Sequence, residues 1–395
     1  MRILMVHNYY EQPGGEDAVV RSEYELLEKN HQEVSLYKRS NAEIKSFSLA
    51  QRIKFLTQLE WSRQSYQQLR RRIREFRPDI VHFHNIFYLI TASAYDACHD
   101  EGVPVVQSQH NFRPLCSNGL FFRDNAVCEE CLDHSLWRGV RYGCFKGSRL
   151  ATLPMARMLM AHQKKGTWPK KVDRYIMATE FTRRKYVQAG IPENKISLKP
   201  HFVFSPSARR TDQGYALYIG RLSSEKGVDV LVKAWQTLSQ IPLKIIGSGP
   251  LAVELSEFAR QQGMDQVQFL GYVSAQQYES NLKGAMFLVL PSVCYENFPR
   301  VVVEAYSCGV PILASRLGSV AELVKDGQTG VTFTPGNEND LREKARWLVD
   351  HPREREQMGQ GAQRLYDEKF TAQKNYEALM AIYHQTIEDY KGSRR

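Results

Sequence analysis

The sequence has no apolar run long enough to cross a membrane. A spanning helix needs about 18–20 consecutive apolar residues, and no stretch of this chain approaches that length. The first residues, Met1 to His7, have the pattern of a short strand and not that of a signal peptide. We therefore expect a cytoplasmic protein, with a peripheral location at the inner face of the cell membrane left open.

The second half of the chain has no net charge. Residues 1–205 contain 31 Lys and Arg residues against 21 Asp and Glu, whereas the remainder has 22 of each. The excess is densest at 70–72, 74 and 77, and at 164–165 and 170–171. Such a surface either attracts an anionic membrane or ligand, or forms solvated helix faces. No known nucleic-acid motif accompanies the basic residues, so we expect no nucleic-acid partner.

Internal repeats and low-complexity segments are also missing, and a chain of 395 residues suggests two domains. Apolar strand-like runs alternate with helical patterns from Ile3 to Leu198, and a second series runs from Ala216 to about residue 334. Such alternation indicates doubly wound parallel sheets. Between the series, Pro200 to Gly214 contains Ser205, Pro206 and Ser207 and is expected to be a linker. We place the domains at 1–204 and 205–374.

Two glutamates stand eight residues apart, at Glu296 and Glu304. Glu296 follows an apolar run from Phe287 to Leu290, and Glu304 falls in the helix that comes next. Ligands of open α/β sheets bind at such strand ends. Each carboxylate is therefore a candidate acceptor for a sugar hydroxyl, although two solvated acids on an exposed helix would show the same spacing.

A second motif reads Gly220-Arg221-Leu-Ser-Ser-Glu-Lys226-Gly227. It follows an apolar strand and opens a helix. The free N–H groups at a helix N-terminus favour anions. Arg221 and Lys226 add two cations suited to phosphate, so the motif predicts a site for a diphosphate.

Together these motifs resemble the retaining, nucleotide-sugar-dependent glycosyltransferases of family 4, also called group 1. The resemblance implies a GT-B fold, in which two Rossmann-like domains face each other across a cleft. It also implies that a last helix, at about 375–391, packs back on the first domain. In such enzymes Arg221 and Lys226 would stabilise the leaving diphosphate, Glu296 would contact the donor sugar, and Glu304 would hold the ribose.

Further donor contacts are implied by the same resemblance. They come from glycines that let the backbone approach the donor and from residues bordering the sugar or base: Gly15, Gly220, Gly249, Tyr272, Val273, Asn297 and Phe298. Pro299 has no N–H to offer at its position. Arg300 is an extra cation that either faces phosphate or points to solvent.

In the first domain, His110 ends a strand where similar enzymes carry a histidine near the donor sugar and leaving group. Glu16 and His84 are acceptor-side candidates, and His82 is expected in the core. No Asp-x-Asp pair occurs in the chain. We therefore expect protein cations, and no catalytic metal, at the diphosphate of a UDP- or GDP-sugar.

Four of the seven cysteines cluster within an expected insertion at about 112–147: Cys116, Cys128, Cys131 and Cys144. One Cys-x2-Cys hook with two flanking cysteines is the pattern of a tetrahedral structural zinc site. Reduced free thiols are the main alternative, and disulfides are disfavoured in the cytoplasm.

The predicted function is transfer of a hexose from a nucleotide sugar to a glycan or lipid-linked glycan in cell-surface polysaccharide biosynthesis. Two alternatives use the same fold: a glycosyltransferase with a soluble small-molecule acceptor, and a sugar-nucleotide epimerase. A nucleic-acid-binding protein with a zinc module is a disfavoured alternative of a different class.

Overall fold

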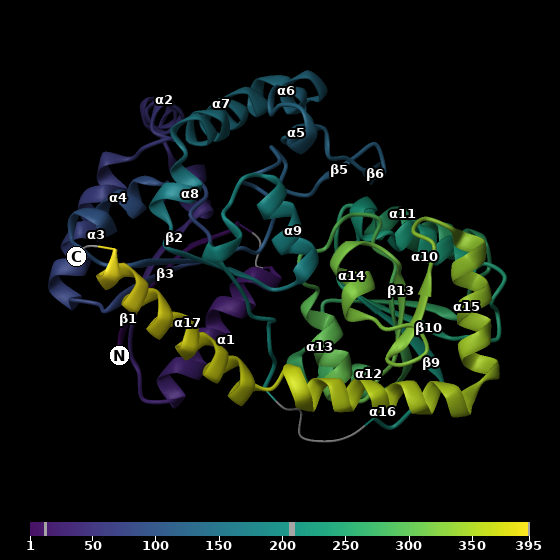
Figure 1. Ribbon diagram of the computed structural model, residues 1–395. Coiled ribbons are helices and arrows are strands. Elements are labelled where there is room, and N and C mark those ends of the chain that lie inside the picture. Colours follow the sequence, from purple (N-terminus) through teal and green to yellow (C-terminus); the bar gives the residue numbers. More distant parts are fainter. Residues whose placement is uncertain (12–13, 205–209, 394–395) are drawn as a thin grey trace. The chain divides into compact units, whose positions relative to one another are not determined.

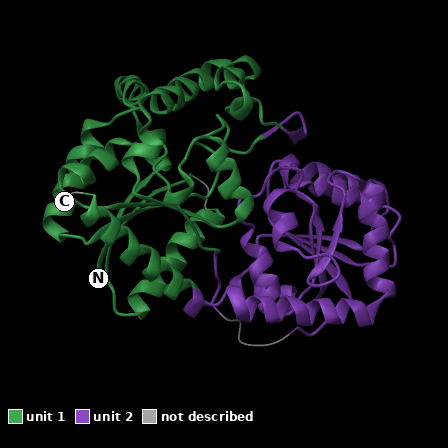
Figure 2. Ribbon diagram, in the orientation of Figure 1, with its two compact units in different colours: residues 1–121, 128–200, 375–395 green, residues 122–127, 201–374 purple. Residues whose placement is uncertain are grey.

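The computed structural model describes residues 1–11, 14–204 and 210–393 (Figure 1). The chain divides into two compact units (Figure 2). Unit 1 comprises Met1–Phe121, Cys128–Pro200 and Asn375–Arg395, and unit 2 comprises Phe122–Val127 and His201–Lys374. The expected domain boundary at 204/205 stays a prediction, because Ser205, Pro206 and Ser207 of the expected linker lie outside the described residues.

Unit 1 is built on a six-stranded parallel sheet in the order β2-β1-β3-β4-β7-β8. Its strands are β1 (Arg2–Tyr9), β2 (Glu33–Ser40), β3 (Ile80–Phe83), β4 (Val105–Ser108), β7 (Arg174–Met177) and β8 (Ile196–Leu198). Ile3 to Val6 of β1 are fully buried, as expected for a strand covered on both faces. The strand order reverses between β1 and β3, and the loops that follow these strands meet at that point.

The helices of unit 1 cover both faces of this sheet (Figure 1). They are α1 (Gly15–Lys29), α2 (Leu49–Thr57), α3 (Arg63–Phe76), α4 (Ser93–Asp100), α5 (Glu130–Asp133), α6 (Trp137–Tyr142), α7 (Arg149–Lys165), α8 (Thr167–Lys171), α9 (Glu180–Gln188) and α17 (Ala372–Gly392). Helix α17 belongs to this unit: Leu379 and Tyr383 lie in one buried cluster with Ile3 and Val20. The last helix of the chain thus packs in the first core.

Unit 2 contains a second six-stranded parallel sheet, in the order β11-β10-β9-β12-β13-β14. Its strands are β9 (Tyr215–Ile219), β10 (Leu243–Ile246), β11 (Val267–Gly271), β12 (Ala285–Leu290), β13 (Ile312–Ser315) and β14 (Gly330–Phe333). The order reverses between β9 and β12. In open α/β sheets such a reversal is where ligands bind, beyond the carboxyl ends of the strands.

Seven helices belong to unit 2 in the described part of the chain: α10 (Val228–Trp235), α11 (Ala252–Gln261), α12 (Ala275–Gly284), α13 (Arg300–Ser307), α14 (Gly318–Leu323), α15 (Glu338–Asp350) and α16 (Pro352–Lys369). Trp235, Phe287 and Phe333 are fully buried in its core. A short antiparallel hairpin, β5 (Phe122–Arg123) and β6 (Ala126–Val127), completes the strands of the described residues.

The sequence predicts helical structure over about 49–76 and over 338–391, and the structure divides both stretches into separate helices. The helical pattern over 49–76 divides into α2 and α3, because Ser62 caps a new helix by accepting a hydrogen bond from the N–H of Ser65 at 3.3 Å. The pattern over 338–391 divides into α15, α16 and α17. Its first break falls at Pro352, since the residue before a proline is disfavoured in a helix.

The basic clusters of the first half have acidic partners. Arg70 and Arg74 both pair with Glu101, at 2.6 and 2.9 Å. Lys165 pairs with Glu60, and Lys171 pairs with Asp96. These pairs offset part of the local positive charge, which favours the solvated-face interpretation for these clusters. None of the helices in the described ranges is both long and apolar enough to cross a bilayer.

Candidate active site

The loops after β9 and β12 bring Lys226 and Glu296 together at the strand-order reversal of unit 2. Lys226 Nζ donates to Glu296 Oε1 at 2.6 Å. Ser292 Oγ donates to the same oxygen at 2.7 Å. Ser292 was not predicted from the sequence, because a single serine in a loop carries no motif. The two motifs, separated by 70 residues in sequence, thus form one polar site.

Mutual attraction keeps both groups of this pair charged. Burial favours a lower pKa for Lys226, but the charge and hydrogen bond of Glu296, together with Cys294 and Glu225, outweigh burial and raise the pKa. Burial likewise favours a higher pKa for Glu296, but the charge and hydrogen bond of Lys226, together with the hydrogen bond from Ser292, outweigh burial and lower the pKa. The site therefore presents an ammonium beside a carboxylate, which suits one anionic and one hydroxyl-bearing ligand group.

Gly227 joins the two loops. Its φ is +64°, and a Cβ at this position would lie 2.0 Å from the carbonyl oxygen of Pro291 in the β12 loop. The N–H of Val293 donates to the carbonyl of Glu225 at 3.1 Å across the same junction. Only glycine allows this close approach without moving one of the loops.

Glu304 lies on α13, between two side chains of unit 2. Tyr278 donates a hydrogen bond to Glu304 Oε2, and Arg300 Nε is 3.1 Å from Glu304 Oε1. Arg300, for which the sequence left phosphate or solvent open, therefore pairs with Glu304 in this structure. Tyr278 was not found from the sequence because its helix, α12, showed no motif.

The other expected donor residues of unit 2 lie on loops at the same sheet edge. Gly249 packs so closely on Leu222 that a Cβ would lie 2.4 Å from the Leu222 carbonyl oxygen, so loop packing alone explains this glycine. Among these donor residues, Asn297 and Phe298 are buried, and Gly220 and Val273 are partly exposed. Arg221 and Tyr272 are exposed, and 87% of Tyr272 is accessible to solvent. Their roles in donor binding stay predictions.

In unit 1, His110 and His84 are paired beside a small cavity. His84 Nδ1 and His110 Nε2 are 2.9 Å apart, and the two rings are stacked with an interplanar angle of 13°. The cavity is also lined by Gln107, Gln109 and Asn111. The cavity volume is about 10 Å³, which is about enough for one water molecule.

His84 is 3% exposed and lies within a buried network. Burial lowers its pKa well below the usual value, and the nearby His82, His110, His7 and Lys199 act in the same direction. His84 is therefore neutral at pH 7. The sequence predicted an acceptor contact for His84, which stays a prediction, and the contact seen here is with His110.

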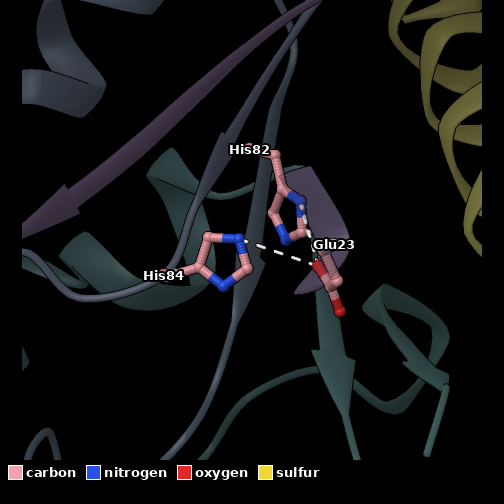
Figure 3. A group of neighbouring side chains, drawn as sticks. All are labelled: Glu23, His82 and His84. Atoms are coloured by element: carbon pink, nitrogen blue, oxygen red, sulfur yellow. Dashed lines mark ion pairs between the residues drawn. The ribbon is translucent and has the colours of Figure 1, made fainter. Parts of the chain in front are cut away.

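Glu23, His82 and His84 bring three potential metal ligands within 4.8 Å of one another (Figure 3). Both ring nitrogens of His82 already form hydrogen bonds. Nδ1 is 2.7 Å from the Tyr383 hydroxyl, and Nε2 is 2.8 Å from Ser108 Oγ. Lys199 Nζ donates to Glu23 Oε1 at 2.6 Å. A metal ion would have to displace these partners and lie beside an ammonium, so the group fits a buried hydrogen-bond network better than a metal centre.

The loop after β1 leads into α1 through Gly14 and Gly15. The N–H of Gly14 donates to Asp17 Oδ2 at 3.0 Å, and Asp17 Oδ1 is 2.8 Å from His7 Nε2. A Cβ on Gly15 would meet no atom within 4 Å, so its backbone is open to a ligand. Glu16 follows, and its Oε2 accepts a hydrogen bond from Asn111 Nδ2 at 3.3 Å.

The four clustered cysteines lie in unit 1, and none of them forms a disulfide. The thiols of Cys116 and Cys131 are hydrogen-bonded, and Cys144 is near enough to Cys131 to interact electrostatically. Main-chain N–H groups of Phe121, Asn118 and Gly119 also point at the Cys116 sulfur. With the Cys131 bond as the largest cause, the pKa of Cys116 falls to about 6. Cys128 directly follows the β5–β6 hairpin.

Two family models match adjoining parts of this chain. Glycosyltransferase Family 4 matches residues 14–203, and Glycosyl transferases group 1 matches residues 202–365. The chain belongs to glycosyltransferase family 4. The D-rhamnosyltransferase WbpZ of Pseudomonas aeruginosa is 32% identical over 160 residues, which is 40% of this chain and 42% of WbpZ. The chain spans about half or less of the length of the curated relatives that it matches first.

Solved structures of the same fold cover the whole chain. Anabaena HepE in complex with UDP has a TM-score of 0.67 at 17% identity and covers 99% of this chain and 100% of HepE. Sucrose-phosphate synthase from Thermosynechococcus elongatus has a TM-score of 0.70 at 17% identity, covering 99% of this chain and 98% of the synthase. At such identities the likeness shows the fold, and the predicted GT-B fold class is confirmed.

Proposed function

We propose that this family 4 member is a retaining glycosyltransferase that moves a hexose from a nucleotide sugar to a glycan or lipid-linked glycan in cell-surface polysaccharide assembly. The observation that carries the proposal is the Lys226–Glu296 pair at the strand-order reversal of unit 2. Lys226 would stabilise the charge that grows on the departing diphosphate. Glu296, kept ionised, would accept hydrogen bonds from the donor sugar. Retention follows from the family resemblance.

The donor site is proposed to work without a catalytic metal. The ammonium of Lys226, which is paired with Glu296, would supply the cation that a departing diphosphate needs, and the sequence has no Asp-x-Asp pair. Arg221 would add a second cation from an exposed position. Glu304 would hold the ribose hydroxyls, with Arg300 and Tyr278 fixing its carboxylate. His110 and Gly15 would complete the donor contacts from unit 1.

A screen of nucleoside diphosphates tests the proposal. We expect one of UDP, GDP, ADP and TDP to raise the melting temperature of the full chain by about 5–10 °C at 100 times its Kd, since binding then adds about 2.7 kcal/mol. UDP is the first choice, because HepE binds UDP on the same fold. If none of the four nucleotides binds, the proposed function is wrong.

Structural zinc is part of the proposal. The Cys116–Cys131 contact and the main-chain N–H groups around Cys116 suit a sulfur that serves as a metal ligand. Cys128 and Cys144 would complete a tetrahedral set. Such a metal would order the insertion, and a filled four-cysteine shell would leave no position for substrate.

Metal analysis of the purified full chain checks this assignment. We expect about one zinc per chain in the wild type, its loss in Cys128→Ser, and a lower melting temperature after chelation, because metal binding contributes to folding. Cys308→Ala is the control, since this buried thiol lies in unit 2. If the wild-type protein contains no metal and its melting temperature does not change after chelation, the zinc assignment is wrong.

A further inference from the structure

A cluster of polar side chains lies at the strand-order reversal of unit 1. Tyr10 follows β1, Tyr88 follows β3, and Asn111 and Arg113 follow β4, while Glu16 lies in the first turn of α1. All five are partly exposed, so a ligand can reach them. The site proposed above uses the corresponding reversal in unit 2 for the donor. The reversal in unit 1 offers a second ligand position.

Arg113 is the centre of this cluster. Its Nη1 donates to the Tyr88 hydroxyl at 2.8 Å, and the guanidinium lies 5.4 Å from the centre of the Tyr88 ring. Its Nε is buried with no hydrogen-bond partner. Within the described ranges, no carboxylate lies within 4.0 Å of Arg113. Glu16 is near enough to act on the charge of Arg113, but it is not within ion-pair distance. An arriving anion would supply the direct counter-charge that the guanidinium lacks.

The groups around Arg113 are hydrogen-bond donors. Burial raises the pKa of Tyr10 and of Tyr88, so both hydroxyls keep their protons. Asn111 Nδ2 is 3.1 Å from the Tyr10 hydroxyl. The guanidinium and the two hydroxyl groups match the oxygens of an anion, while the Asn111 N–H groups, which already donate to Tyr10 and Glu16, position those two side chains.

Glu16 does not oppose an anion at neutral pH. Burial, followed by repulsion from Asp17, raises its pKa to about 8, while Asn111 and Arg113 act in the opposite direction. Its Oε1 is buried without a hydrogen-bond partner. Below pH 8 the carboxyl group is protonated and can donate a hydrogen bond. Above pH 8 it becomes a carboxylate and repels an anion. Tyr10 and Tyr186 also face this group.

The cysteine-bearing segment supports this arrangement. Gly119 lies against Arg113, so that a Cβ on Gly119 would be 3.4 Å from Arg113 Nη2. The ring of Phe145 makes an edge contact with Tyr88, with ring centres 5.8 Å apart. The segment that carries the cysteines therefore holds both the cation and its tyrosine partner in place.

We propose that Arg113, Tyr10, Tyr88 and Glu16, positioned by Asn111, bind an anionic oxygen group, a phosphate or a carboxylate, on the glycosyl acceptor. This inference rests on the proposed function and gives its acceptor a chemical class. Lys226 already serves the donor diphosphate in unit 2, so the cation of unit 1 is assigned to the acceptor. Phosphate and carboxylate acceptors share this chemistry.

Calorimetric titration of the full chain with sulfate tests the subsite, because sulfate keeps its charge from pH 6 to pH 9. The titration is run at constant ionic strength, with and without a saturating amount of the nucleotide found by the screen. We expect one sulfate to bind in both conditions, and Arg113→Gln to weaken it at least 10-fold. Arg138→Gln is the matched control, since this arginine of the same segment is 3.6 Å from Glu130. Tyr88→Phe, which keeps the ring, should weaken sulfate binding several-fold if Arg113→Gln fails to fold.

The outcomes separate the two proposals. If the nucleotide binds but sulfate does not, the acceptor subsite is wrong and the proposed function stands. If the nucleotide displaces sulfate, the cluster belongs to the donor diphosphate and the inference is overturned. If no nucleotide binds, the proposed function fails by itself. A second series in the same assay then compares methyl phosphate with acetate, and the tighter of the two identifies the acceptor group.

The pH dependence gives an independent readout. We expect sulfate affinity to fall as pH rises through about 8, where Glu16 ionises, and Glu16→Gln to remove that fall. A fall that persists unchanged in Glu16→Gln would contradict the role assigned to Glu16.

Discussion

Replacing Lys226 with alanine should reduce turnover by about 100-fold or more, as expected when one preorganised charge-stabilising group is lost. The ammonium is the group placed to meet negative charge at the strand-order reversal of unit 2, 2.6 Å from Glu296. Its removal also leaves Glu296 without its counter-charge, so the pKa of this carboxyl should rise. Nucleotide release from the donor sugar, followed at saturating donor, measures the effect.

Lys233→Ala is the matched control for that experiment. Lys233 lies on α10, and its side chain is 50% exposed, with a distant partner at 3.9 Å in Glu338. An exposed ion pair of this kind contributes little to the free energy of unfolding. Lys233 also lies outside the proposed donor site, so turnover should stay close to that of the wild type. Near-normal turnover in Lys226→Ala would show that another group meets the leaving diphosphate, and Arg221 would be examined next.

Most of the strands were predictable, because the inner strands of both sheets are short buried runs separated by helical patterns. The Lys226–Glu296 site was predictable for the same reason: each residue follows a strand end, and neighbouring strand ends share one edge of the sheet. The sequence could not show that Ser292 would supply a third contact. A serine in a loop has no periodicity and no characteristic spacing.

The network in unit 1 shows where sequence reasoning fails. Glu23 looks like an ordinary residue of an amphipathic helix, yet Lys199, 176 positions away, donates to it inside the core. Arg113 resembles any loop arginine until Tyr88 and Gly119 are seen beside it. Such pairings depend on tertiary packing, which local patterns do not encode.

The two sheets place different chemistry at equivalent points. In unit 2 the reversal carries a paired lysine and carboxylate, each held in its charged form. In unit 1 it carries a guanidinium among neutral donors, with a carboxyl group held in its protonated form at neutral pH. A charged pair suits a ligand that brings both an anion and hydroxyl groups, as a nucleotide sugar does. A lone cation among donors suits a single anionic group.

Replacing Gly227 with alanine should be among the most destabilising single changes in unit 2. The left-handed conformation costs a non-glycine residue roughly 1–2 kcal/mol. In addition, the new Cβ would overlap the Pro291 carbonyl, 2.0 Å away, and backbone there cannot move without separating the β9 and β12 loops. We expect a total loss of about 3–5 kcal/mol, which lowers the melting temperature by about 6–20 °C.

Gly263→Ala separates strain from overlap. Gly263 has nearly the same φ, +65°, but its Cβ would meet no atom within 4 Å. It should therefore show the conformational cost alone, a shift of about 2–8 °C, and keep nucleotide affinity. Gly227→Ala should lose nucleotide affinity as well, because the junction that positions Lys226 against Glu296 opens. Equal effects of the two substitutions on melting and on nucleotide binding would mean that the loop junction does not hold the donor site together.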